Sequence, residues 1–190
     1  MEDQGEPHLT RLFAPGVAVL LGFVLLAGNP WLDLAAAIDD SDSFLRVATV
    51  LVSYPNWQVD VDRAGPFLFW FWNLRTVLFV VLTALGLSAA RNWVGAAGGR
   101  GRFVVTVGVT ALGATVAGLV SGLVAVTLLD TREALPLIVP GRPEDFFLVQ
   151  FSTSAAFGVL FGSVLGAVVA VQRAAPAERE RRAGEPKSLW

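Results

Sequence analysis

The 190-residue sequence contains no cysteine and only one histidine, His8. The absence of cysteine excludes disulfides, thiolate metal sites, iron–sulfur clusters and cysteine nucleophiles. A single histidine in a polar N-terminal stretch likewise excludes haem ligation by paired histidines and histidine-rich metal centres. Lysine is almost absent as well, since Lys187 is the only one among 14 basic residues. Such a preference for arginine often reflects a GC-rich bacterial genome, so we expect a bacterial protein.

Charge is also scarce, and this scarcity sets the class of protein. Only 16% of the residues are charged, whereas a soluble domain carries about a quarter. Hydrophobic residues make up 54%, and the mean hydropathy is +0.61. A helix of roughly 20 apolar residues crosses the hydrocarbon core of a bilayer, which is about 30 Å thick. Four windows of the sequence meet this length, so an integral membrane protein is predicted.

The predicted fold is all-α: a polytopic four-transmembrane-helix bundle. The first predicted span ends at Asn29-Pro30, because the residue before proline is pushed out of helical geometry. An acidic start and a long apolar stretch argue against the competing interpretation of this span as a cleaved signal peptide. The predicted spans are 9–28, 67–90, 103–129 and 146–172, forming a transmembrane domain over 9–172 with external loops 29–66 and 130–145, an N-tail 1–8 and a charged C-tail 173–190.

The distribution of basic residues predicts the orientation of the spans. Arginine and lysine near span ends collect on the cytoplasmic side of a membrane. Counting also the residues near span ends, nine basic residues lie on the side of the two tails and of the loop between the second and third spans, against at most five on the opposite side, whose two loops also carry ten acids. Both termini are therefore expected in the cytoplasm, with the protein in the plasma membrane.

Small residues recur at every fourth position in the last two predicted spans. On a helix this spacing forms a face where another backbone can approach closely, as van der Waals packing in lipid requires. The two faces either pack on each other within the chain or also join subunits or a partner helix. The residues of this expected packing face are Ala114, Gly118 and Gly122 in the third span, and Ser154, Gly158, Gly162, Gly166 and Ala170 in the fourth.

Few polar residues inside the spans are candidates for function. Arg75 lies near the outer boundary of the second span, where an arginine can snorkel to the interface. It alternatively pairs with Asp33 or Asp145, or meets an anionic headgroup from the outer leaflet. Gln150 and Ser152 near the outer end of the fourth span either bond to their own helix or line a polar vestibule. No acid is buried in a span, which disfavours proton-coupled transport.

The first external loop combines acidic residues with a short apolar stretch. Its five clustered carboxylates lack the spacing and turn glycine of a calcium-binding loop, so a solvated acidic loop and no metal site are expected (Asp39, Asp40, Asp42, Asp60 and Asp62). The largely apolar stretch from Phe44 to Tyr54 predicts a short helix capped by Asp42 or Ser43. That helix is expected to lie on the membrane surface or against another subunit.

Motifs for catalysis and cofactor binding are absent from the sequence. It has no phosphate-binding loop, no nucleophile elbow and no zinc-protease motif, and no basic domain for nucleic acid. We therefore expect no catalytic residue and no cofactor. The preferred function is an accessory or assembly subunit that acts through helix packing and its external loops, in contact with membrane lipid and with a larger membrane protein or further copies of itself. The alternatives are a small oligomeric channel or carrier and, third, an intramembrane enzyme acting on lipid through Arg75 and an outer acid.

Overall fold

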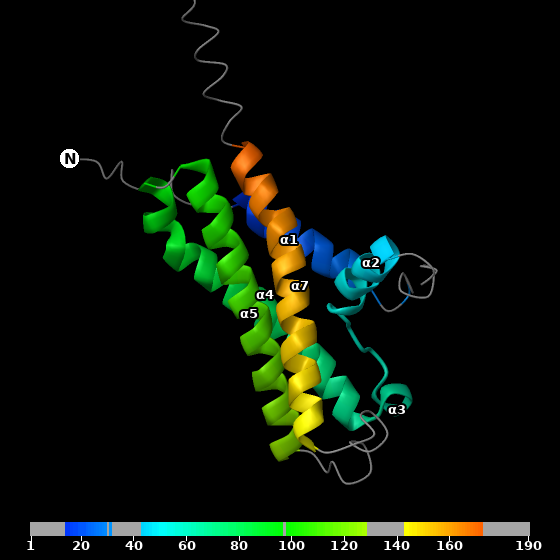
Figure 1. Cartoon of the computed structure of the whole chain (residues 1–190). Coiled ribbons are helices and arrows are strands. Elements are labelled where there is room, and N and C mark those ends of the chain that lie inside the picture. Colours follow the sequence, from blue (N-terminus) through cyan, green and yellow to red (C-terminus); the bar gives the residue numbers. More distant parts are fainter. Residues whose placement is uncertain (1–13, 30, 32–42, 97, 129–142, 173–190) are drawn as a thin grey trace, which may run out of the picture.

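The structure is a computed structural model that describes residues 14–29, 31, 43–96, 98–128 and 143–172. Within these residues every regular element is a helix, which confirms the all-α class (Figure 1). Three helices are long, and three are short. The long ones are α4 (Pro66–Ala96), α5 (Gly99–Leu128) and α7 (Pro143–Gln172), and the short ones are α1 (Ala14–Ala27), α2 (Ser43–Ser53) and α3 (Val61–Ala64).

Each long helix is apolar over a length that can cross a membrane. The apolar stretches cover 25 residues in Pro66–Ala90, 30 in Gly99–Leu128 and 27 in Asp145–Val171. At a rise of 1.5 Å per residue, each exceeds the roughly 30 Å of hydrocarbon in a bilayer. Their length and composition indicate a membrane protein.

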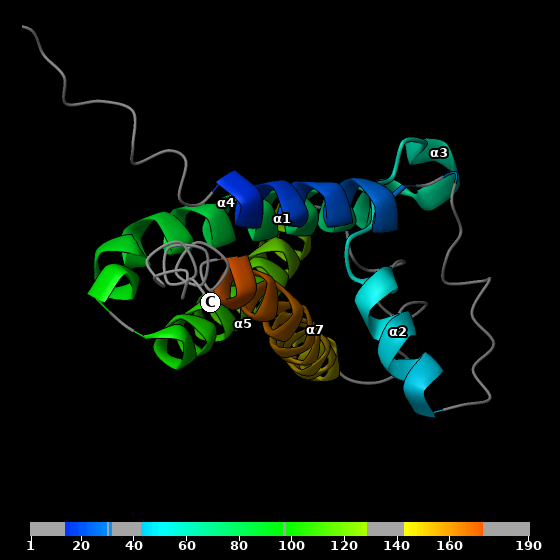
Figure 2. The same ribbon diagram turned by 90° about the horizontal axis from the view of Figure 1, so that it is seen from above.

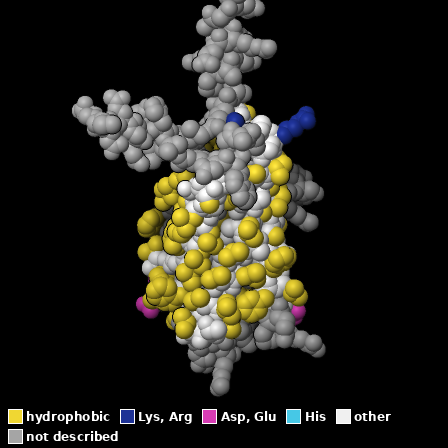
Figure 3. Space-filling model, turned by 90° about the vertical axis from the view of Figure 1, so that its left-hand side faces the viewer, with side chains coloured by type: hydrophobic (Ala, Val, Ile, Leu, Met, Phe, Trp, Pro, Cys, Tyr) yellow, Lys and Arg dark blue, Asp and Glu magenta, His cyan; other side chains and the backbone are white. Residues whose placement is uncertain are grey.

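The surface of the bundle agrees with this class. Large apolar side chains point outward in each long helix, with Leu85 62%, Leu112 65% and Leu148 65% exposed. Figure 3 shows apolar side chains across the face of the bundle, with arginine near its upper end and acidic side chains near its lower end. So extensive an apolar surface is rare on a soluble monomer, whereas lipid solvates it.

Proline and glycine set where the long helices begin. Pro66 and Pro143 each occupy the first position of a long helix, where the missing N–H has no partner to lose. Before α4, the one-turn helix α3 is capped by Asp60, whose Oδ1 accepts hydrogen bonds from the N–H groups of Asp62 and Arg63. Gly65 then adopts φ 78°, a conformation that L side chains rarely adopt, and turns the chain into α4.

Glycines bring α5 and α7 into close contact along their whole length. A Cβ on Gly158 would lie 2.5 Å from Ala111 Cα, and one on Gly162 would lie 3.0 Å from Val107 Cα. Gly118 faces Ser154 of α7 in the same way. The remaining members of the expected packing face also lie in or near this interface: Ala114 is buried, Gly122 meets Phe146, Gly166 meets Phe103, and Ala170 is half-buried. The structure thus places these contacts within one chain.

Aromatic rings fill the centre of the bundle. Phe157 and Phe161 of α7 stack with their ring centroids 5.7 Å apart, and Phe79 of α4 packs edge-on to Phe157 at 5.1 Å. Phe23 of α1 stacks on Phe161 at 4.4 Å. These rings belong to the main buried cluster, which joins α1, α4, α5 and α7.

Helix α1 is shorter than the first predicted span. Its described part has 14 residues, roughly 21 Å of helix, which is shorter than the hydrocarbon core of a bilayer. It begins beside the last turns of α7, where Gly16 faces Val169, and reaches the middle of α7 at Phe157. The described helix agrees with the predicted span 9–28 from Ala14 to Ala27, and residues 9–13 lie outside the described part.

The chain resumes in α2, which confirms the short helix expected over 44–54. Figures 1 and 2 show α2 standing beside the three long helices rather than among them. After α2, residues 54–60 run in an extended path from mid-bundle, where the Tyr54 hydroxyl bonds to Ala114 O, to α3 beside the start of α4. This extended path thus lies along α4, between its middle and its start.

Candidate functional site

The extended residues after α2 are held by polar side chains of α4. Asn73 donates from Nδ2 to Gln58 O at 2.9 Å, and its Oδ1 accepts from Gln58 N–H at 3.1 Å. Thr76 Oγ1 accepts from Asn56 N–H at 3.3 Å. In lipid, backbone outside a helix is tolerated only where such partners satisfy it. Asn73 and Thr76 therefore take the place of a neighbouring strand.

Arg75 lies on the same helix and is buried. Its side chain is only 6% exposed, and Nη2 donates to Tyr54 O at 2.7 Å. Nη1 lies 3.4 Å from Gln150 Oε1, a long hydrogen bond, whereas Nε has no partner. The guanidinium carbon lies 4.5 Å from the centroid of the Tyr54 ring. Arg75 therefore does not snorkel toward the membrane interface, as was expected. Its side chain instead points into the protein and donates to the carbonyl of Tyr54, the first residue after α2.

Tyr54 ties this site to the other two long helices. Its ring stacks on Phe157 of α7 at 3.9 Å with an interplanar angle of 6°. Its hydroxyl donates to Ala114 O of α5 at 2.7 Å, so both ends of the residue are engaged. An aromatic ring with a bonded hydroxyl is a rigid anchor in an apolar interior. Tyr54 therefore fixes the end of α2 against α4, α5 and α7.

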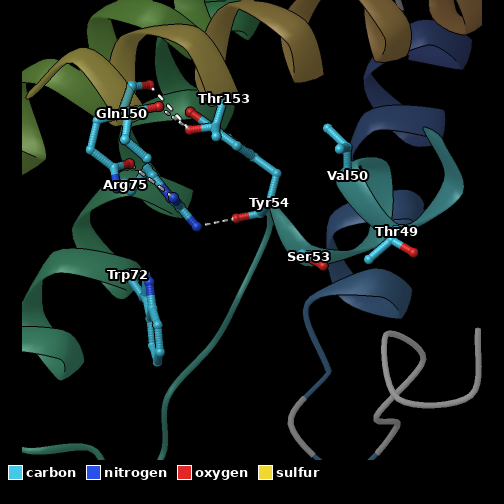
Figure 4. Close-up of a pocket in the computed structure, with 9 residues that line it drawn as sticks. Thr49, Val50, Ser53, Tyr54, Trp72, Arg75, Gln150 and Thr153 are labelled. Atoms are coloured by element: carbon cyan, nitrogen blue, oxygen red, sulfur yellow. Dashed lines mark hydrogen bonds between the residues drawn. The ribbon is translucent and has the colours of Figure 1, made fainter. Parts of the chain in front are cut away.

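A pocket of about 470 Å³ opens beside Arg75, between α2 and the long helices (Figure 4). Helix α2 forms one wall and α4 and α7 form the other. Its lining is polar and apolar in mixture: Thr49, Val50, Ser53, Tyr54, Trp72, Arg75, Val149, Gln150 and Thr153. We call this space the lateral pocket. Its lining offers one cation, several hydroxyl groups and an amide.

The structure brings together only some of the residues singled out from the sequence. Arg75 and Gln150 meet in the lateral pocket, 75 positions apart in the chain. Ser152 is exposed, and its hydroxyl donates to the carbonyl of Leu148 in its own helix, α7. This contact agrees with the first of the two interpretations given above, a bond within the helix. Asp33 lies outside the described residues. Asp145 is exposed, and none of the hydrogen bonds found for Arg75 involves it.

Sequence reasoning missed Tyr54, Asn73 and Thr76. A signal for two of them was present, since Asn73 and Thr76 flank Arg75 within an otherwise apolar span. Polar groups at such a place need partners, and three of them in four residues indicate one shared partner. The identity of that partner, a segment 15 to 20 residues earlier, is a long-range feature of the fold.

Metal binding finds no support among the residues that the structure describes, where no group of three histidine, cysteine or acidic side chains converges. The hydroxyl, amide and guanidinium groups of the lateral pocket favour an oxyanion over a metal cation.

Comparison with known proteins gives no relative for this arrangement. No protein-family model matches the chain, no curated protein matches it, and no solved structure matches its fold. Its function is therefore argued from the site alone.

Proposed function

We propose that this chain is a small accessory or interaction subunit of a membrane assembly, acting by binding through the lateral pocket. The observation that carries the proposal is the place of the pocket, at the side of the bundle between α2 and the long helices. Val50 and Val149 of its lining are partly exposed, so the pocket continues into the lipid-facing surface. A side pocket that continues into the lipid-facing surface suits contact with another membrane component.

A small carrier is the second candidate because α1 is followed, after α2, by an extended segment that packs on α4. Binding sites of carriers are often built where a spanning helix is interrupted near the middle of the bilayer. Here α1 ends at Ala27, and the carbonyl of the next residue, Gly28, accepts from Trp57 N–H of the extended segment at 3.0 Å. Phe79, Phe157 and Phe161 fill the centre of the bundle, which argues against a pore along its axis.

The topology that we propose has four crossings, the first made by α1 followed by residues 54–60. The start of α1 lies beside the end of α7, which supports termini on the same side of the membrane. Exposed Arg100 lies where α5 begins, at that end of the bundle, and exposed Asp60 and Asp62 lie near the start of α4, at the other. By the positive-inside rule, the termini are cytoplasmic, in a bacterial plasma membrane.

Cysteine labelling tests this topology without background, because the chain has no cysteine. In intact spheroplasts, a membrane-impermeant maleimide is expected to label the Asp62→Cys variant and to leave the Arg100→Cys variant unlabelled. After permeabilisation both react, because both positions are exposed. The reverse pattern contradicts the orientation, and labelling of both in intact spheroplasts contradicts the separation of the two ends.

The subunit proposal is tested by the mass of the complex purified gently from its native membrane. We expect a stoichiometric larger membrane protein to co-purify. A photo-crosslinking residue at Val50, in the lateral pocket, is expected to attach to that partner. The matched control is Leu112 of α5, which is 65% exposed against 36% for Val50 and lies outside the pocket, and it is expected to attach only to lipid. A lone monomer or a homo-oligomer without a partner overturns the subunit proposal.

A further inference from the structure

The guanidinium of Arg75 is a buried cation that has more N–H donors than hydrogen bonds. It carries five N–H groups, and two hydrogen bonds are found for it, one of them long at 3.4 Å. The Nε donor is buried without a partner. Desolvating a charge costs several kcal/mol unless a counter-ion or full hydrogen bonding compensates. The described contacts of Arg75 supply a carbonyl, an amide oxygen and two aromatic faces, which compensate only part of that cost.

The acids that the structure describes are elsewhere. Asp60 and Asp62 are exposed in and before α3, and Asp145 is exposed in the first turn of α7. None of these three carboxylates forms an ion pair with Arg75. The lateral pocket, by contrast, reaches Arg75 directly and offers about 470 Å³ of space. Among the acids whose side chains the structure describes, none neutralises Arg75, and the lateral pocket is where a negative charge from another molecule can reach it.

We propose that the lateral pocket binds the phosphate headgroup of an anionic membrane phospholipid, with Arg75 as its counter-ion. The planar guanidinium fork matches a phosphate through paired N–H donors, and its Nε donor is buried without a partner. Ser53, whose exposed side chain lines the same pocket, supplies a hydroxyl group for one of the remaining oxygens. This inference rests on the proposed function, because both take the lateral pocket as the binding site. It adds the identity of the ligand in that pocket.

The surroundings of the pocket favour a lipid over a free anion. Val50 and Val149 form part of its lining, and Leu148 and Phe151 next to it are 65% and 51% exposed on the lipid-facing side of α7. Acyl chains that follow this apolar surface stay in hydrocarbon while the headgroup enters the pocket. Arg75 lies nine residues into α4, roughly 13 Å along its axis, so a soluble anion would have to leave water to reach it. A lipid brings its phosphate from within the membrane.

The test is lipid binding by the full chain in phosphatidylcholine nanodiscs, titrated with phosphatidylglycerol that carries brominated acyl chains. Bromine quenches nearby indoles, and Trp72 lines the pocket. We expect saturable quenching beyond that given by brominated phosphatidylcholine. Arg75→Gln is expected to weaken the apparent affinity at least tenfold, since hydrogen bonds to charged groups are worth about 1.5–3 kcal/mol. The matched control Arg63→Gln removes an exposed arginine and is expected to change it less than about threefold.

A second variant guards against misfolding of Arg75→Gln. Thr153→Phe fills the pocket from an exposed position of α7, keeps Arg75 and adds no indole, so it is expected to abolish the saturable quenching in a folded protein. Equal quenching by both lipids, or equal loss in the Arg63→Gln control, overturns the inference. Displacement by millimolar inorganic phosphate also overturns it, because the ligand is then a soluble anion. Co-purification of a protein partner without lipid preference refutes this inference alone, whereas lipid preference without a partner refutes only the subunit proposal.

Discussion

Gly158→Ala is expected to lower the free energy of unfolding by about 1–3 kcal/mol, the usual cost of overpacking a tight interior. The added Cβ would lie 2.5 Å from Ala111 Cα and 3.1 Å from Thr110 O, both backbone atoms of α5. Backbone in a helix cannot rotate away as a side chain does, so α5 and α7 must separate. Titration with a denaturing detergent in mixed micelles, followed by tryptophan fluorescence, measures the change.

The matched control is Gly108→Ala on α5, where a Cβ meets nothing within 4 Å. Alanine in a helix is favoured over glycine by roughly 0.5–1 kcal/mol, so this variant is expected to be neutral or slightly more stable. The comparison separates close packing from helix propensity, because both variants add the same methyl group. Equal stability of the two variants would show that α5 and α7 do not approach as closely as the structure has them.

The three long helices are the part of the fold that the sequence predicted best. Each is a long apolar run, and hydropathy reports such runs whatever their neighbours are. Their starts were placed slightly late, at the first apolar residues after Pro66 and Pro143. Proline at the first helical position marks the true start, and this local signal was available in the sequence.

The extended segment after α2 shows where hydropathy is insufficient. Hydropathy and the Asn29-Pro30 break place the end of α1 within one residue of Ala27, but they give no sign of the extended segment. The polar residues of that segment, Asn56 and Gln58 among them, resemble a loop in the sequence because their hydrogen-bond partners are side chains of α4. Such pairing between distant segments leaves no periodic pattern in either one.

Arg75 was recognised from the sequence as a candidate, but its surroundings were not. Counting residues along α4 gives its depth, whereas the direction of its side chain depends on what covers the helix. Here its guanidinium donates to the carbonyl of Tyr54 and to the side-chain oxygen of Gln150 on α7. The sequence also singled out Gln150, yet only the packing of α4 against α7 reveals that the two belong to one site.

The extended residues after α2 are expected to detach when Asn73 is replaced by leucine, a side chain of similar size. The change orphans both the N–H and the C=O of Gln58, which Asn73 now bonds at 3.1 and 2.9 Å. Each buried group left without a partner costs about 1–3 kcal/mol, and lipid offers no water to replace it. We therefore expect a loss of about 2 kcal/mol or more in the free energy of unfolding, together with faster hydrogen exchange at the Gln58 amide.

A matched control distinguishes this support from a general need for polar groups. Thr153→Val also removes a hydrogen-bonding group from a long helix, but that hydroxyl is exposed and bonds only to carbonyls of its own helix, with Val149 O at 2.7 Å. Its removal is expected to change stability by less than about 0.5 kcal/mol. Asn73→Asp keeps an acceptor for Gln58 N–H and loses the donor to Gln58 O, so it is expected to fall between the two. If Asn73→Leu leaves amide exchange at Gln58 unchanged, the extended segment is held by Tyr54 and Thr76 alone, and the account of Asn73 as a substitute strand is wrong.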